Sequence, residues 1–469
     1  HPNLIFILGE GHGWSSTSVD LDGKDPNHAQ PAGLTPNLER MAKEGMRFSD
    51  FYASCPRCTP SRASFLTGLS PAKLHMTYVN EGGRERRGGE DTSQQRVVPP
   101  TPLKDLSPDI ATTASLLRAQ GYATAHFGKW HVGRVDPMQH GFDLSDGPNS
   151  NQGPDRDAAP NPTQCFEITE RGIEFVREQA KAGKPFFLQL SHYAVGAESD
   201  VTPESLDEAR ALLPKVNSRQ LAQAAGVRDV DKALGQLLAV LDSLELTKTT
   251  YVFFSTDHGT PGGNANPSRG NGANPPFAGG KGSVREGGIR IPFLALGPDV
   301  AAGTLSGVRA SGMDLLPTLL DLAGAPLKTP EIPDDPLSVE GGSLAQVLRG
   351  VGAGKVVRPR EELVIHFPHY DLDNGGPASA IYLDEWKLVR NYDTGAVTLH
   401  DIAKDREERN DVAKDQPETV KELLGRLDGY LAAVGAQMPT KIGEAPSQPT
   451  PPTERRERRG RGEKRRGGE

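Results

Sequence analysis

The stretch Asn3-Leu4-Ile5-Phe6-Ile7-Leu8 decides the fold class, because five apolar residues follow one another without a polar break. A short continuous apolar run predicts a strand that is buried on both of its faces. Three further strand-like runs follow along the chain, at Ala123 to Phe127, Pro185 to Leu190 and Thr250 to Ser255.

Segments with helical periodicity lie between these strands. Thr35-Pro36 is typical of a helix start, as N-cap and first helical residue, and Leu38, Met41 and Met46 are spaced for a buried face. Such alternation of strands and helices predicts a mainly parallel sheet covered by helices on both faces. In a sheet of this kind, the catalytic and binding residues usually lie just past the carboxyl ends of the strands. The other helical stretches are Ile110 to Gln120, Glu170 to Ala182 and Leu221 to Leu244.

The pattern changes after about Arg358. Short strand-like runs separated by turn residues, followed by one helical run, predict a small antiparallel sheet with one helix. We therefore predict a main domain over residues 1–357, a smaller α+β domain over 358–438, and a disordered charged tail over 439–469. The short runs are Leu363 to Phe367, Ala380 to Leu383, Trp386 to Arg390, Val397 to His400 and the helical Pro417 to Val434.

Composition excludes several classes of protein. The 469 residues suffice for one large core and a smaller domain, and 35% hydrophobic with 24% charged residues indicate a globular chain. The net charge of −8 argues against nucleic acid as a partner. No apolar run is long enough to predict a membrane span, and we find no signal peptide in the sequence. Three cysteines are too few for a disulfide framework.

The sharpest chemical motif is Cys58-Thr59-Pro60-Ser61-Arg62, which continues to Gly68. One interpretation of Cys58 is a buried free cysteine that packs as a small hydrophobic residue. Another is a redox pair with Cys55, although the sequence does not show the strand-to-helix context that such a pair requires. With only three cysteines in the chain, a chance match to Cys-x-Pro-x-Arg is rare.

The segment from Cys58 to Gly68 resembles the signature of the type I sulfatases of the alkaline phosphatase superfamily, in which the cysteine is oxidised to formylglycine. Four further segments resemble that family in the same order. The similarity spans residues 3 to about 438 and implies an α/β fold, an α/β/α sandwich like that of alkaline phosphatase with a small C-terminal antiparallel α+β domain. The four segments are Gly121 to Thr124 with Gly128 to His131, Asp257 to Gly259, Gly279 to Pro292, and His366 to Tyr370 with Trp386 to Leu388.

The resemblance implies hydrolysis of sulfate esters through a formylglycine made from Cys58. One hydroxyl of the hydrated aldehyde would attack sulfur, and the second would collapse to release sulfate. Arg62 would hold the formylglycine, Lys129 and His131 would lie beside it with His131 as the base, and Lys281 would clamp sulfate oxygens. The implied partners are a small-molecule or carbohydrate sulfate ester and, during maturation, the formylglycine-generating enzyme. The implied location is periplasmic or secreted.

The resemblance also implies one divalent metal ion, Ca²⁺ or alternatively Mg²⁺, bound by Glu10, Asp257, His258 and the modified Cys58. Members of the family usually carry two aspartates after the first strand. In this chain Glu10 matches the first with one extra methylene, and Gly11 matches the second without any side chain. Metal affinity or metal choice is therefore expected to differ.

A second departure lies at Gly196, where the family usually places a histidine that protonates the leaving oxygen. A general acid typically contributes about 10²–10⁴-fold to a rate. The candidates for replacing it, or for binding substrate, are His192, His366 and His369.

Two alternatives to a sulfatase remain open. Hydrolysis of phosphate or phosphonate esters is one, because the superfamily shares a layout of metal and nucleophile. The other is a degenerate sulfatase that binds sulfated glycans with little turnover, which Gly11 and Gly196 favour. The presence of the other implied site residues disfavours it; they are Cys58, Arg62, Lys129, His131, Asp257 and Lys281.

Overall fold

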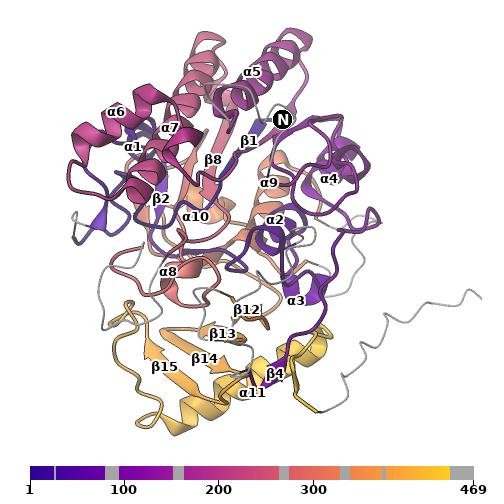
Figure 1. Ribbon diagram of the computed structural model, residues 1–469. Coiled ribbons are helices and arrows are strands. Elements are labelled where there is room, and N and C mark those ends of the chain that lie inside the picture. Colours follow the sequence, from indigo (N-terminus) through magenta and orange to yellow (C-terminus); the bar gives the residue numbers. More distant parts are fainter. Residues whose placement is uncertain are drawn as a thin grey trace, which may run out of the picture.

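The computed structural model describes residues 1–25, 28–79, 95–151, 163–262, 274–327, 339–371 and 376–443. Its centre is an eight-stranded sheet with the strand order β10-β2-β9-β8-β1-β7-β5-β6. Figure 1 shows helices on both sides of this sheet and a second, smaller sheet beside it at the other end of the molecule. The predicted fold class, a layered α/β structure with a small antiparallel sheet, is confirmed.

The parallel part of the central sheet contains the four predicted strands. β1 (Asn3–Gly9) lies between β7 (Phe186–Ser191) and β8 (Thr250–Thr256) and runs parallel to both. β5 (Ala123–Gly128) pairs in parallel with β7 and with the edge strand β6 (Leu144–Ser145). Because these strands are parallel, the residues that follow them leave the sheet at one edge.

The sheet as a whole is mixed but mainly parallel, as we predicted, because a single strand among its eight runs against the others. β9 (Phe293–Leu296) is antiparallel to both β8 and β2 (Met46–Phe48), and β10 (Thr304–Ser306) is parallel to β2. Three- and four-residue strands are too short to give a recognisable apolar run, so the sequence does not reveal them.

Side chains of β1 alternate between two cores, as a strand buried on both faces requires. Leu4, Phe6 and Leu8 pack into one core, and Ile5 and Ile7 pack into the other. The first core includes side chains of α2 (Cys58–Thr67), α4 (Thr113–Ala119), α9 (Leu315–Ala323) and α10 (Ala345–Arg349). The second includes side chains of α1 (Pro36–Glu44), α5 (Cys165–Ala182) and α7 (Ser218–Ser243), and α6 (Pro203–Leu212) packs on α7. We refer to the shorter helices as α3 (Pro71–Leu74) and α8 (Glu286–Ile289).

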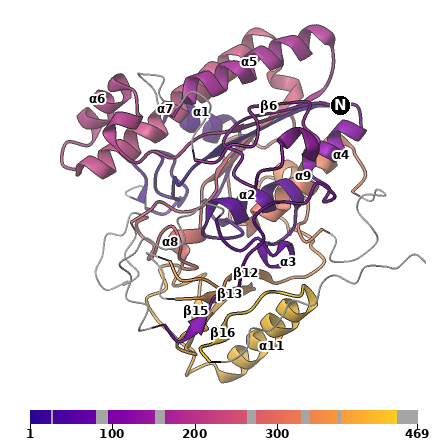
Figure 2. The same ribbon diagram turned by 45° about the vertical axis from the view of Figure 1, so that its right-hand side comes forward.

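The C-terminal sheet, defined as β12 to β15, is antiparallel throughout, as predicted. One face carries α11 (Pro417–Ala433), and the other packs against residues that adjoin α2 and α8. Figure 2 shows α11 on the side of this sheet that faces away from the central sheet. Its strands are β12 (Leu363–Phe367), β13 (Ala378–Leu383), β14 (Trp386–Asn391) and β15 (Val397–Asp401).

Ordered structure continues past residue 438, where we predicted the tail to begin. β16 (Thr440–Lys441) pairs with β4 (Val97–Val98). The predicted tail from 444 onwards lies outside the described residues. Two further short strands, β3 (Phe51–Tyr52) and β11 (Ala310–Ser311), pair near α2. In the described part of the chain, no helix is both long and apolar enough to cross a membrane.

A buried cluster of charges joins the C-terminal sheet to the central part of the protein. Glu286 of α8 accepts hydrogen bonds from Lys387 of β14 (2.9 Å) and from Tyr382 of β13 (2.5 Å). Glu286 also pairs with Arg290 (2.6 Å), and Lys387 pairs with Glu408 (2.9 Å). Burial alone would raise the pKa of Glu286, but the charges of Lys387 and Arg290 outweigh it and lower the pKa to about 2.

Replacing Lys387 should therefore destabilise the whole fold. Lys387→Met leaves two carboxylates in the interior without their shared cation, and breaking a buried pair in this way costs about 3–5 kcal/mol. Unfolding in guanidinium chloride measures the loss. Lys404→Met is the matched control, because its ion pair with Asp401 is on the surface, and it should leave the transition almost unchanged. Equal transitions for the two variants would contradict the role given to this cluster.

Candidate active site

The side chains with chemistry converge at the carboxyl edge of the parallel strands. Gly9 of β1 lies opposite Thr256 of β8, so Glu10 and Asp257 leave the sheet side by side. Lys129 directly follows β5. The position of these residues at the strand ends confirms what the strand–helix alternation predicts.

Helix α2 brings the cysteine motif to the same edge. Cys58 is its first residue, all ten residues of the helix are buried, and Gly68 closes it in the left-handed conformation at φ 68°. The helix begins six residues after β3, so the strand-to-helix context that a redox pair requires is present although the sequence does not show it. The two thiols nevertheless differ: Cys55 packs in an apolar cluster, and burial raises the pKa of its thiol.

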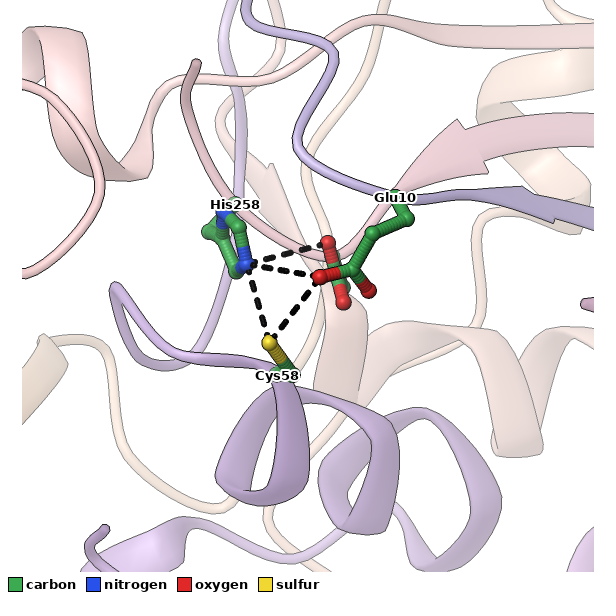
Figure 3. Close-up of side chains that lie close together, drawn as sticks. Glu10, Cys58 and His258 are labelled. Carbon is green, nitrogen blue, oxygen red and sulfur yellow. Dashed lines mark hydrogen bonds and ion pairs between the residues drawn. The ribbon is translucent and has the colours of Figure 1, made fainter. Parts of the chain in front are cut away.

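Cys58, in contrast, meets three polar side chains, and Figure 3 shows two of them, Glu10 and His258. Its thiol donates to Oε1 of Glu10 at 3.1 Å, and its sulfur lies 3.2 Å from Nε2 of His258. Nζ of Lys281 donates to the sulfur at 3.3 Å. Burial and Glu10 act to raise the pKa of Cys58, but Lys129, Lys281 and His258 outweigh them and lower it to about 6. Of Cys55 and Cys58, only Cys58 has the surroundings of a reactive group.

Four of these groups could hold a metal ion. The ligand atoms of Glu10, Cys58, Asp257 and His258 all lie within 4.8 Å of one another, and all four residues are buried. His258 places Nδ1 2.9 Å from the carbonyl oxygen of Gly259, which can only accept, so Nε2 is the nitrogen that faces the cluster.

The electrostatics of the cluster fit a divalent cation. Burial and the neighbouring charge of Glu10 raise the pKa of Asp257 to about 7, since two carboxylates crowd one buried space. Burial lowers the pKa of His258, but Asp257 outweighs it and raises the pKa to about 9. Two carboxylates that repel each other and an imidazole that gains charge indicate a place where positive charge is favoured. The donor atoms are two carboxylate oxygens, one imidazole nitrogen and the Cys58 sulfur. Conversion of Cys58 to formylglycine would replace that sulfur with oxygen, and only this oxygen-rich set suits a hard cation.

Arg62 and Lys129 form ion pairs that neutralise the carboxylates of Glu10 and Asp257. Arg62 pairs through Nη2 with Glu10 (2.8 Å) and through Nε with Asp257 (3.2 Å). Its Nη1 donates to the backbone carbonyl of Lys129 at 2.9 Å. Nζ of Lys129 lies 3.0 Å from Glu10 and donates to Asn151 at 2.6 Å. Asn151 was not anticipated from the sequence, because it lies in a loop 22 residues beyond Lys129 and belongs to no motif.

Gly11 contributes only its backbone to the site. Its backbone N–H donates to Oδ1 of Asp257 at 3.0 Å, and its φ of 64° is in the region that favours glycine. A Cβ at this position would lie 3.4 Å from the ring of His258. The chain therefore orients one metal-site carboxylate with a backbone donor at the position where the family usually has a second one.

The structure connects the other predicted histidines to partners outside this cluster. His192 follows β7 and lies 3.4 Å from the sulfur of Cys165. His366 contacts Ser379 (2.7 Å) and the carbonyl of Gln437 (3.0 Å), and His369 contacts Thr77 (2.8 Å). Burial lowers the pKa of all three rings to between about 3 and 4. A role for them in binding substrate stays a prediction. His131 is buried two residues after Lys129, with a left-handed φ of 55°, and its role as base likewise stays a prediction.

The segment before Gly196 does reach the site. A cavity of about 20 Å³, roughly the size of one water molecule, lies beside Glu10 and Lys281. Gly196 itself is exposed, and its N–H donates to Asp200 at 2.8 Å. Gln223 of α7 was not predicted as a site residue, and nothing in its sequence surroundings marks it. The remaining residues that line this cavity are Gly11, His12, Ala194, Val195, Gln223 and Pro261.

A model of the Sulfatase family matches residues 2–325, which is more than half of the chain. The chain belongs to the sulfatase family. This sulfatase is 32% identical over 359 residues to the N-acetylgalactosamine-6-sulfatase of Canis lupus familiaris. The match covers 69% of the present chain but only 62% of the length of the canine protein. The structure of Ps i-CgsB in complex with k-i-k-neocarrahexaose superposes with a TM-score of 0.71 at 24% identity, covering 92% of both chains. The structure of the phosphonate monoester hydrolase of Agrobacterium radiobacter superposes with a TM-score of 0.64 at 18% identity. This superposition covers 94% of the present chain and 99% of the hydrolase.

Metal binding should raise the thermal stability of this sulfatase. Ca²⁺ relieves the repulsion between Glu10 and Asp257 only in the folded state, and a ligand at 100 times its Kd stabilises by about 2.7 kcal/mol. We expect Ca²⁺ to raise the melting temperature of chelator-treated protein, and Mg²⁺ to do so less. Asp257→Asn should abolish the increase, whereas the exposed Asp109→Asn should keep it. An unchanged melting temperature, with no bound metal by elemental analysis, would rule the site out.

Proposed function

We propose that this protein hydrolyses sulfate esters with a nucleophile made from Cys58. The observation that carries the proposal is the position of the Cys58 sulfur, 3.1 Å from Glu10, 3.2 Å from His258 and 3.3 Å from Lys281 in a buried site. A group at that position faces both the predicted metal ligands and a cation that can bind an anionic ester. Membership of the sulfatase family supports the same conclusion.

The protein side chains divide the work between them. Lys129 and Lys281 supply positive charge on the side where a sulfate group would approach Cys58. Arg62 holds Glu10 and Asp257 in fixed orientations, so that they can bind a cation without reorganising. A divalent cation held by Glu10, Asp257 and His258 would supply Lewis-acid activation, and formylglycine at Cys58 would supply the attacking hydroxyl. Ca²⁺ is the metal we favour, because carboxylate ligands suit a hard cation.

The proposed substrate is a sulfated carbohydrate or a small sulfate ester. The name of the canine relative, an N-acetylgalactosamine-6-sulfatase, supports the carbohydrate. A periplasmic or secreted location and maturation by a formylglycine-generating enzyme are parts of the same proposal.

Two competing functions are distinguishable. Phosphonate ester hydrolysis is supported only by the shared fold of the hydrolase from Agrobacterium radiobacter. A binding protein without turnover is favoured by Gly11 and Gly196. The intact arrangement of Cys58, Arg62 and Lys281 around the cluster favours catalysis instead.

Cys58→Ala should abolish hydrolysis of nitrophenyl sulfate without unfolding the protein, because Cys58 is a reacting group. Peptide mass over residues 55–68 should also show the loss that accompanies conversion of CH₂SH to CHO in the wild type. Cys55→Ala is the matched control, since Cys55 is also buried and lies three residues before Cys58 but packs in an apolar cluster, and it should retain activity. A folded Cys58→Ala variant with wild-type activity would refute the mechanism. Loss of activity in Cys55→Ala with no mass change in the wild type would favour the redox pair.

Glycine at position 196, where the family usually has a histidine, predicts how the rate depends on the leaving group. Without a proton donor the leaving oxygen departs as an anion, so the rate should fall steeply as the pKa of the leaving group rises. Gly196→His should flatten this dependence and accelerate poor leaving groups by up to about 10²–10⁴-fold. The substitution is tolerable, because a Cβ at Gly196 would meet only Asp200, at 3.4 Å.

A series of aryl sulfates measures the slope in the wild type and in three variants. Ala197→His, in the same exposed loop, controls for adding an imidazole and should leave the slope steep. His192→Ala tests the rival proposal, in which His192 has taken over the role of the acid. A shallow slope in the wild type that His192→Ala steepens would overturn the missing-acid interpretation.

A further inference from the structure

Arg57, the residue before Cys58, is held in one position by two other side chains. Its Nε and Nη2 donate to the two carboxylate oxygens of Asp371, which lies beyond β12. Its guanidinium also lies 5.6 Å from the ring centre of Tyr78. The Asp371 side chain is only 1% exposed and that of Arg57 13%, so the pair is largely removed from solvent. Such a bidentate pair fixes the plane of the guanidinium.

The same pair lies against the segment that carries Lys281. The N–H of Gly282 donates to the carbonyl of Pro56 at 2.9 Å. A Cβ on Gly282 would lie 2.8 Å from the carboxyl carbon of Asp371, so that only glycine allows this approach. Arg57 is therefore adjacent in sequence to the proposed nucleophile, and its partner Asp371 touches the residue that follows the proposed sulfate-binding lysine.

One part of the guanidinium remains available to a ligand. Nε and Nη2 are used by Asp371, whereas Nη1 makes no hydrogen bond to the described residues of the chain. The carboxylate cancels the charge of Arg57 while leaving the N–H groups of Nη1 in a fixed direction. A neutralised and rigid donor suits a neutral oxygen acceptor better than a second anion.

We propose that Arg57 is a specificity-determining residue, which donates a hydrogen bond from Nη1 to a hydroxyl or ring oxygen of the sugar that carries the scissile sulfate. Asp371 and Tyr78 are positioning residues that act through Arg57. The inference rests on the proposed sulfatase function and adds a contact to the uncharged part of the substrate. It assigns the C-terminal part of the chain a share in substrate recognition.

The test compares a sugar sulfate with a sulfate ester that has no sugar oxygens. Competitive inhibition of nitrophenyl sulfate hydrolysis by a panel of monosulfated monosaccharides, including N-acetylgalactosamine 6-sulfate, gives a Ki even where turnover of the sugar is slow. The double variant Arg57→Gln/Asp371→Asn removes both charges together, so that neither is left alone in the interior. We expect its Ki for the best sugar sulfate to rise about tenfold or more, because a hydrogen bond from an ionic donor is lost. The KM for nitrophenyl sulfate should rise several-fold less than this Ki, because that ester has no sugar oxygen for Arg57 to bind.

Two further arms separate recognition from architecture. Arg40→Gln removes an arginine whose ion pairs are on the surface and should change neither constant. Asp371→Asn alone leaves the charge of Arg57 without its carboxylate, so the preference should shift from monosulfated towards disulfated sugars. If the pair were purely structural, the double variant would bind the sugar sulfate and nitrophenyl sulfate more weakly by the same factor. Asp371→Asn would then show no shift towards disulfated sugars. Either result would overturn the inference.

The outcome also separates this inference from the proposed function. A wild-type protein that hydrolyses nitrophenyl sulfate but is not inhibited by any sugar sulfate would refute the sugar contact and leave the sulfatase function standing. A metal-loaded wild-type protein with converted Cys58 that hydrolyses no sulfate ester would refute the proposed function, and the inference with it.

Discussion

The site depends on the buried guanidinium of Arg62. Arg62 lies one turn after Cys58 on α2, and its nitrogens reach Glu10 beyond β1, Asp257 beyond β8 and the carbonyl of Lys129 beyond β5. One planar group therefore fixes the start of the helix against the ends of three parallel strands. Each of these charges would be costly to bury alone, so the ion pairs form together or the site does not form.

The balance between cationic and carboxylate side chains in the site explains what glycine at position 11, in place of the family's second aspartate, changes. Arg62, Lys129 and Lys281 face only two carboxylates, because Gly11 contributes an N–H instead of a third. A divalent cation adds to this excess of positive charge. The site is thus biased towards an anionic ligand, and a metal ion bound there would be held by fewer negative groups than the family pattern provides. The same change that would weaken metal binding would strengthen the attraction for the proposed sulfate monoester.

The sequence predicted the elements whose burial leaves a periodic or continuous apolar signal. β1, β5, β7 and β8 are apolar runs, and α1, α5 and α7 have apolar faces. Helix α2 escaped prediction as a helix because every one of its residues is buried, and a helix buried on all sides has no amphipathic period. In the site, the motif residues Cys58, Arg62, Lys129 and Lys281 met as the family resemblance implies. Asn151 and Gln223 did not follow from the sequence, because each reaches the site through tertiary contacts from a segment without a motif. Asp371 lies one residue beyond the family-like segment His366 to Tyr370, and its pairing with Arg57 is likewise a tertiary contact that the sequence does not reveal.

The segment that carries Lys281 shows why the two sheets act as one unit. On one side, Gly282 is hydrogen-bonded to Pro56 in the turn before Cys58. On the other, Glu286 is buried against Lys387 of the C-terminal sheet, and its N–H donates to Glu408 at 2.8 Å. Five residues therefore connect the proposed sulfate-binding lysine to a charge network in the other sheet. A shift of the C-terminal sheet would be carried through this short segment to Lys281, so the smaller sheet contributes to the geometry of a site whose proposed catalytic residues all lie outside it.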